Sequence, residues 1–306
     1  MTSSLAQSQP QGSPSGGPFA TAVSRTFGLI PPPGLLLLAI VSIQVGAAFA
    51  TQLFAALGPS GVVFLRIGFA ALMLLAFWRP RLDATVRANL GLLLVYGLVI
   101  ALLNFSFYQA IARIPLGVAV TIEFMGPLAL AVFGSRRLPE FLWIGLAVIG
   151  VLLLAPDIGP TLDPLGVAFA ALGGLCWATF VLLTVRVGRV FERGSGLALG
   201  MTIAAIALLP TGLPGLSAGL AEPALLMAAF AVALLSTTIP FSLEFEALKR
   251  MPPRTYGVLI TLEPAIAVMI GAALLSDSLT WRSLLAVTCV TAAAIKITLL
   301  DKGKNR

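Results

Sequence analysis

A single carboxylate lies near the middle of a long apolar stretch, and its position suggests chemistry inside a membrane. Glu123 belongs to Ile114–Phe133, IPLGVAVTIEFMGPLALAVF. At about 1.5 Å per residue, a helix of this length can cross a bilayer. An ionisable side chain at that depth costs roughly 2.5–3.5 kcal/mol on insertion scales, so it usually lines a cavity or meets a partner. Glu123 is therefore our first candidate for binding a proton or a substrate ammonium group, with pairing to Arg66 as the structural alternative.

Glycine and proline follow this carboxylate closely. Gly126 and Pro127 lie three and four residues after Glu123. Proline removes a backbone donor and crowds the preceding turn, so we predict a helix break or hinge at this point. Pro115, near the start of the stretch, is a second candidate, and Pro252 and Pro264 later in the chain are further candidates. A charge beside a helix break is what a solute pathway through lipid would need.

The same stretch recurs further along the chain at a constant offset of 137 residues. The matched pairs are Ala110 and Ala247, Pro115 and Pro252, Pro127 and Pro264, and Glu140 and Asp277. Four matches on one offset, inside apolar blocks of similar length, indicate an internal repeat. The second carboxylate, Glu263, directly precedes Pro264, whereas Glu123 lies four residues before its proline. The two copies thus share an architecture but place their carboxylates differently.

Two more charged residues within the apolar segments have both a functional and a structural interpretation. The residue before a proline is pushed out of helical geometry, so Glu263 could face an unwound segment or could cap freed backbone amides. Arg66 could bind a substrate carboxylate through its guanidinium. It could equally neutralise Glu123 or extend toward the membrane surface.

Uncharged polar residues within the segments could complete such a site. Asn104 and Tyr108 are four residues apart and share a helix face. Gln44 lies in the first segment. Interhelical polar contacts are common in membrane bundles and contribute about 0.6 kcal/mol on average, so each residue could serve packing alone. We expect several of them to line one cavity together.

Glu244 and Glu246 lie near three cations, Lys249, Arg250 and Arg254. A surface ion-pair network is the interpretation that we favour for both carboxylates. A gate at the cytoplasmic side is the alternative.

The composition identifies an integral membrane protein. Of 306 residues, 58% are hydrophobic and 10% are charged, whereas a soluble domain has about 25% charged residues. The chain has no histidine, which excludes a histidine proton relay and most catalytic triads. Its two cysteines have no metal-ligand spacing. We therefore expect no metal, no cofactor, no nucleic-acid partner and no enzymatic activity.

The apolar runs predict an all-α protein with ten transmembrane helices, since a barrel would show short alternating segments. The predicted spans are residues 35–55, 60–78, 89–109, 115–134, 140–156, 164–185, 196–213, 223–245, 254–275 and 280–299. Residues 1–33 are rich in Ser, Gly, Pro and Gln and are predicted to be a disordered tail. Residues 34–156 and 160–300 then form the two repeats.

The distribution of lysine and arginine predicts the orientation. With both termini in the cytoplasm, fifteen of these cations fall on the inside and two on the outside. Five spans per repeat is an odd number, so the second repeat must be inverted relative to the first. Inverted repeats are typical of transporters that hold their solute near the midplane between the halves.

Three phrases resemble a known family: SIQVGAAFATQLF, IPLGVAVTIEFMGPLALAVFGSRR and STTIPFSLEFEALKRMPPRTYGVLITLEPAIAV. They are similar to the threonine/homoserine exporters of bacterial inner membranes, which belong to the drug/metabolite transporter superfamily and consist of two EamA-type repeats. The likeness covers about residues 34–300. It implies ten helices, cytoplasmic termini and efflux of small amino acids driven by the proton gradient.

We therefore expect a secondary exporter of threonine, homoserine or similar amino acids, in which Glu123 or Glu263 holds either a proton or the substrate ammonium group. One alternative is another amino acid, metabolite or drug-like cation in the same fold. A lipid-modifying enzyme is a weaker alternative, because no nucleophile–base pair is visible. The sequence leaves the oligomeric state open, and a monomer is compatible with it.

Overall fold

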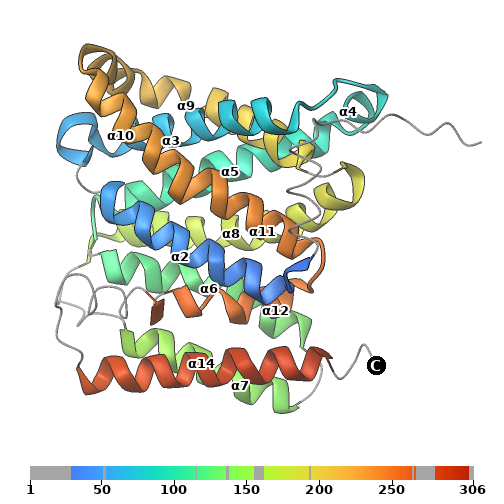
Figure 1. The fold of residues 1–306 in the computed structure, drawn as a ribbon. Coiled ribbons are helices and arrows are strands. Elements are labelled where there is room, and N and C mark those ends of the chain that lie inside the picture. The colour runs from blue at the N-terminus through green and yellow to red at the C-terminus, as the bar shows by residue number, and fades with distance from the viewer. Residues whose placement is uncertain are drawn as a thin grey trace, which may run out of the picture.

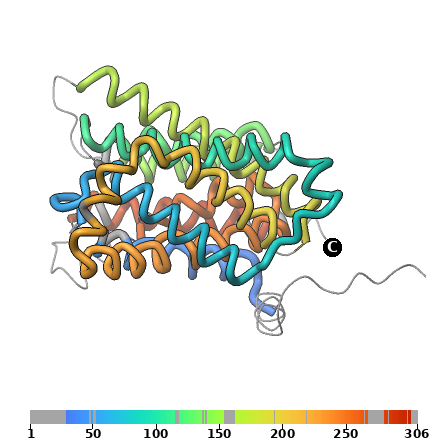
Figure 2. Tube along the Cα trace, turned by 90° about the horizontal axis from the view of Figure 1, so that it is seen from above, coloured from blue at the N-terminus to red at the C-terminus, as the bar shows by residue number. Residues whose placement is uncertain are grey.

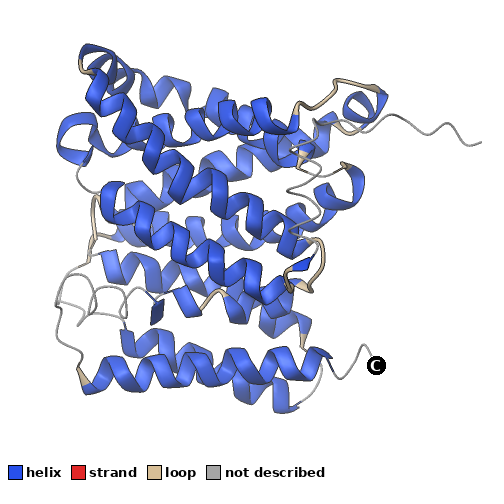
Figure 3. Ribbon diagram, viewed as in Figure 1, coloured by secondary structure: helices blue, strands red, loops and turns tan. Residues whose placement is uncertain are grey.

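The computed structural model describes residues 29–50, 53–114, 116–135, 138–154, 162–192, 194–263, 265–266 and 280–302. Within these ranges all regular structure is helical, which confirms the predicted class (Figure 3). The predicted tail as far as residue 28 lies outside the described residues, as do Pro115, Pro264 and Asp277.

The described helices form one bundle (Figures 1 and 2). They are α2 (Pro32–Ala50), α3 (Phe54–Trp78), α4 (Ala84–Ala88), α5 (Leu90–Ile111), α6 (Leu116–Gly134), α7 (Leu138–Leu154), α8 (Pro164–Val190), α9 (Ser195–Ala221), α10 (Pro223–Ala233), η2 (Leu234–Thr238), α11 (Ile239–Leu248), α12 (Pro253–Leu259) and α14 (Trp281–Lys302). Long apolar segments adopt helices because only intrahelical hydrogen bonds satisfy the backbone in a medium without water. Proline begins α8, α10 and α12, where its missing N–H group has no helical partner to lose.

Five helices of the described chain are long and apolar enough to cross a membrane: Phe54–Trp78, Leu90–Ile111, Pro164–Val190, Ser195–Ala221 and the continuous segment Pro223–Leu248. Shorter apolar helices occupy Pro32–Gly46, Val118–Gly134, Glu140–Leu153 and Leu284–Ile297. The presence of several membrane-spanning helices agrees with the sequence analysis. The count of ten stays a prediction.

Helices α3 and α9, which come from different predicted repeats, pack against each other with their backbones close together. A Cβ atom added to Gly61 would lie 2.7 Å from the Cα of Gly215. Gly212 lies directly against the ring of Phe64. The residue numbers of the contacts increase along α3, from Gly61 to Phe64, and decrease along α9, from Gly215 to Gly212. The two helices are therefore antiparallel.

Helices α7 and α14 form a second antiparallel pair between the predicted repeats. Gly150 of α7 faces Cys289 of α14, where an added Cβ would lie 3.2 Å from the cysteine side chain. Toward the other end, the Lys296 ammonium group lies 5.7 Å from the Trp143 ring centroid. The pair lies at the lower edge of the bundle in Figure 1.

The two ends of the bundle differ in charge. The start of α2, helix α4, the α8–α9 connection, the end of α11 and the C-terminal end of α14 lie at the right-hand end in Figure 1. Cations in or next to these segments include Arg79, Arg81, Arg87, Arg186, Arg189, Lys249, Arg250 and Arg254. The connection before α6 and the start of α14, at the opposite end, carry Arg113 and Arg282.

A π-helical turn, η2, interrupts the segment formed by α10 and α11. The Ile239 N–H group bonds the carbonyl of Leu234, five residues back. In the same pattern, residue 240 would donate its N–H group to the carbonyl of Leu235. Residue 240 is a proline and has no N–H group, so this hydrogen bond cannot form. The hydroxyl of Ser42 in α2 donates to that Leu235 carbonyl at 2.5 Å instead. Helix α2 thus stabilises a π turn, a feature often found at functional sites.

Replacing Ser42 by alanine should lower the free energy of unfolding by about 1 kcal/mol, because the Leu235 carbonyl would lose its donor. Thermal unfolding in detergent measures this change. Ser217→Ala is the matched control, since its exposed hydroxyl bonds only a carbonyl of its own helix, that of Pro214. Equal unfolding temperatures for the two variants would contradict the role assigned to Ser42.

Candidate functional site

Glu123 lies in α6 and is buried, with 6% of its surface exposed. A Cβ atom at Gly173 of α8 would lie only 2.8 Å from the Glu123 Oε1 atom. The missing side chain at Gly173 therefore makes room for the carboxylate. Electrostatic interactions join Glu123 to Glu263, with like charge, and to Arg66, with opposite charge. Glu123 thus interacts with both of the other charged residues named in the sequence analysis.

The expected break at Gly126–Pro127 is not present, because α6 is helical throughout Leu116–Gly134. Pro127 deprives only the carbonyl of Glu123, four residues back, of its helical donor. That oxygen faces Gly174 of α8, where an added Cβ would lie 2.8 Å away. Gly126 itself lies directly against the Gly174 carbonyl. This glycine therefore permits close packing of α6 on α8.

Helix α12 packs antiparallel on the half of α6 that follows Glu123. Gly257 lies directly against the Pro127 carbonyl, and Gly134 lies against Arg254, where an added Cβ would be 2.9 Å from the arginine Cβ. Pro252, a predicted hinge, is the extended residue that precedes α12. It marks the start of a helix and does not interrupt one.

Glu263 is half-buried and follows α12. The N–H groups of Thr261 and Glu263 donate to the carbonyls of Val258 and Ile260, three residues back, at 3.1 and 2.9 Å. This bonding is tighter than that of an α-helix. The backbone thus departs from regular α-helical bonding near Glu263, as expected for a residue that precedes a proline.

The fold brings Arg66 of α3 together with Asn104 and Tyr108 of α5. The Arg66 Nη2 atom donates to the Asn104 side-chain oxygen. Asn104 in turn donates to the carbonyl of Ile100 at 2.8 Å. The guanidinium carbon lies 5.4 Å from the Tyr108 ring centroid. The buried Nε–H group of Arg66 has no hydrogen-bond partner in the described structure, so it remains available to an acceptor such as a carboxylate.

Gln44 is not brought into this group by any described contact. It is half-buried on α2. That helix packs mainly against η2 and α11, whereas Arg66 lies on α3 and Asn104 on α5.

The fold adds three residues that the sequence analysis did not place in the site. Glu244 of α11 is 4% exposed, and Tyr256 of α12 is fully buried. The Tyr256 hydroxyl interacts with the Glu244 carboxylate. It accepts a hydrogen bond from the Trp177 indole of α8 at 3.3 Å. Because Glu244 also interacts electrostatically with Glu263, the three carboxylates form one group, which we call the carboxylate cluster: Glu123, Glu244 and Glu263.

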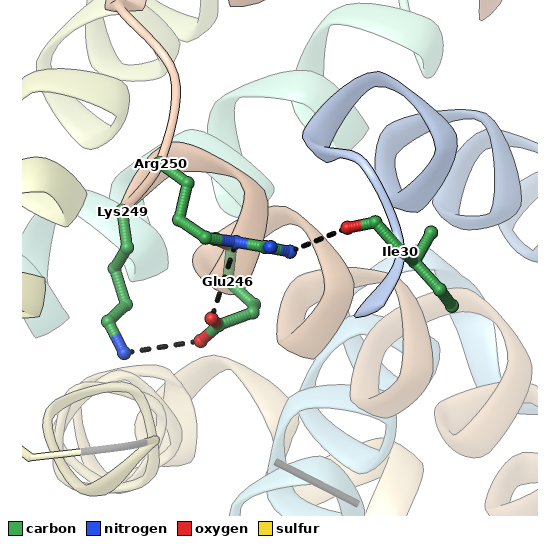
Figure 4. A network of polar contacts seen from close by, with 4 residues as sticks. All are labelled: Ile30, Glu246, Lys249 and Arg250. Carbon is green, nitrogen blue, oxygen red and sulfur yellow. Dashed lines mark hydrogen bonds and ion pairs between the residues drawn. The ribbon is translucent and has the colours of Figure 1, made fainter. Parts of the chain in front are cut away.

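The predicted surface network is confirmed for Glu246 (Figure 4). It is wrong for Glu244, which is buried. Glu246 accepts from the Lys249 ammonium group at 3.2 Å and pairs with the Arg250 guanidinium at 3.5 Å. Arg250 also donates to the carbonyl of Ile30 at 3.0 Å. Residues two apart on a helix point in nearly opposite directions, so only one of the two glutamates can face solvent. That spacing was the signal available in the sequence.

Arg254, which we had assigned to the same network, pairs elsewhere. Its guanidinium lies 3.7 Å from the carboxylate of Glu140, at the start of α7. Glu140 is buried, and this ion pair links the two predicted repeats at the basic end of the bundle.

The geometry suits a ligand that carries both a positive and a negative charge. The carboxylate cluster can bind an ammonium group or protons, and Arg66 offers a donor for a carboxylate. Among the described residues, no group of three or more His, Cys, Asp or Glu could hold a metal ion.

Comparison with known proteins places this geometry in context. The model of the EamA-like transporter family matches residues 164–299. The threonine/homoserine exporter RhtA of Salmonella typhimurium (strain LT2) is 42% identical over 270 residues, which cover 87% of this chain and 90% of that protein. The Escherichia coli (strain K12) exporter of the same name is 41% identical over 277 residues, covering 89% and 92%. One solved crystal structure, 20% identical, aligns with a TM-score of 0.68 over 89% of this chain and 98% of the other, so the fold is shared.

Proposed function

This chain belongs to the EamA-like transporter family, and from that premise we propose that it exports small amino acids such as threonine and homoserine in exchange for protons. The names of its relatives support the cargo. The observation that carries the exchange mechanism is the carboxylate cluster with Arg66 nearby.

The charge balance of the cluster supports coupling to protons. A single guanidinium cannot neutralise three carboxylates, and uncompensated charge inside a membrane is costly. The cluster therefore requires protons or a cationic group. A substrate ammonium group supplies a positive charge when it binds, so it competes with protons for the carboxylates. Because Glu123 or Glu263 holds a proton or the ammonium group and never both, cargo and protons move in opposite directions.

The packing of the helices supports alternating access. Helix pairs α3 and α9, α6 and α12, and α7 and α14 join the predicted repeats in antiparallel contacts. We propose two inverted five-helix repeats, residues 34–156 and 160–300, which rock against each other around the carboxylate cluster. The basic end of the bundle then faces the cytoplasm of a bacterial inner membrane, as the positive-inside rule requires.

Transport by the purified protein in liposomes tests this function. With an imposed pH gradient, labelled threonine or homoserine should move against its own gradient, and a protonophore should abolish the accumulation. A counterflow panel of other amino acids and of drug-like cations defines the cargo. If threonine and homoserine neither accumulate nor exchange while another class of solute does, the proposed cargo is wrong.

Glu244 and Glu246 form a matched pair of variants within one helix. Glu244→Gln should lower gradient-driven flux by about tenfold, since a hydrogen bond to a charged group is worth roughly 1.5–3 kcal/mol. Glu246→Gln removes only a surface network, which contributes about 0–1 kcal/mol, and should leave the flux unchanged. Initial rates in liposomes compare the two. Equal initial rates in the two variants would show that Glu244 takes no part in transport.

A further inference from the structure

An apolar pocket of about 410 Å³ lies between α3 and the η2–α11 segment, and none of the residues of the carboxylate cluster lines it. Sites for small ligands commonly have volumes of about 300–1,000 Å³. The lining includes Met73, Phe77, Trp78 and Ile239. It contains no charged side chain, so the pocket suits an apolar ligand.

The two hydroxyl groups of the lining are already engaged. Ser242 donates to the backbone carbonyl of Thr238 at 2.6 Å. The Thr238 hydroxyl lies 3.8 Å from the Met73 sulfur, within hydrogen-bond distance for a sulfur acceptor. A water molecule needs two to four polar partners, and these groups offer few. A hydrocarbon chain therefore fits the pocket better than water or a polar solute.

Cations lie beside the end of the pocket that Phe77 and Trp78 form. Helix α3 ends at Trp78, and the next residue is Arg79. The Arg79 side chain turns back over the last turn of α3, where its Nε–H group donates to the carbonyl of Ala76 at 3.3 Å. Arg81 is exposed two residues later. These arginines precede α4 at the basic end of the bundle (Figure 1).

We propose that this pocket binds an acyl chain of an anionic glycerophospholipid, whose phosphate pairs with Arg79 and Arg81. A guanidinium binds phosphate through two parallel hydrogen bonds. Each basic residue near a membrane surface favours anionic lipid by roughly fivefold. A zwitterionic lipid has the same chains, but its ammonium group offsets this preference. This lipid site requires only that the protein lies in a membrane, and it does not depend on which solute the protein transports.

Quenching of Trp78 fluorescence by brominated lipid tests the proposal. Trp78 lines the pocket and is 5% exposed. Substitution of Trp143, Trp177 and Trp281 by phenylalanine leaves it as the single reporter. This protein is reconstituted in phosphatidylcholine with increasing fractions of phosphatidylglycerol or phosphatidylcholine that carries bromine on its chains. We expect half-maximal quenching at a roughly fivefold lower fraction of brominated phosphatidylglycerol, the preference of at least one arginine.

Variants separate the headgroup from the chain. The double substitution Arg79→Gln and Arg81→Gln should reduce the preference for phosphatidylglycerol to none, whereas Arg189→Gln, at the end of α8, should retain it. Ser242→Phe should fill the pocket and weaken quenching by both lipids.

Two results would overturn the proposal. Equal quenching of Trp78 by the two brominated lipids would show contact with bulk lipid alone. A preference for phosphatidylglycerol that survives loss of both arginines would show that the phosphate binds elsewhere.

Discussion

Replacing Glu123 by glutamine is expected to lower proton-gradient-driven export of threonine or homoserine by roughly 10- to 100-fold, the worth of a hydrogen bond to a charged group. Glutamine keeps the size of the side chain beside Gly173. It cannot release a proton, and it cannot offer a negative charge to an ammonium group. The variant therefore removes the exchange chemistry while it preserves the packing of α6 on α8.

The measurement is the initial rate of labelled amino-acid flux in liposomes, with and without a pH gradient. The flux that remains in Glu123→Gln should no longer respond to the gradient, and its thermal unfolding in detergent should stay close to that of the parent protein. Glu222→Gln is the matched control, because Glu222 is exposed before α10 and its side chain makes no capping hydrogen bond. Undiminished flux in Glu123→Gln would show that this carboxylate has no part in transport.

The second large effect is expected at Gly126, where a single methyl group should disturb the packing of α6. A Cβ atom there would overlap the backbone carbonyl of Gly174. Backbone cannot move aside as a flexible side chain can, so Gly126→Ala should lower the free energy of unfolding by about 1–3 kcal/mol, the usual cost of overpacking. Transport should fall as well, because Glu123 and Gly126 belong to the same helix.

Gly145 provides the control for this substitution. It lies in α7, and no heavy atom would lie within 4 Å of an added Cβ. Gly145→Ala should be neutral or should stabilise the protein by roughly 0.5–1 kcal/mol, since alanine favours a helix over glycine. Thermal unfolding of both variants in the same detergent gives the comparison. If the two substitutions have the same effect, the close approach of α6 and α8 does not limit stability.

The comparison of Glu244 with Glu246 shows how far the sequence can predict a site in this protein. We predicted both glutamates to lie on the surface, although their spacing of two residues places them on different sides of a helix. The spacing did not say which one is buried, because the side chain's neighbours come from other helices. Glu244 meets Tyr256 of α12, which in turn meets Trp177 of α8. These partners are 12 and 67 residues away in the chain, so no local pattern predicts their contact.

The amino-acid sequence by itself determined the helical class, the membrane environment, the repeat of the proline positions and the candidate role of Glu123. Each of these depends on composition, on residue spacing or on the cost of a charge in lipid. Asn104 and Tyr108 could also be paired from their spacing of four residues.

The tertiary structure alone decided which helix faces meet. In a soluble protein, an apolar stripe shows which side of a helix faces the core. Here lipid and protein interior are both apolar, so the buried and lipid-facing sides of a helix have similar residues. The close contact of Gly126 with α8, the room that Gly173 leaves for Glu123 and the burial of Glu244 therefore became visible only in the packed bundle.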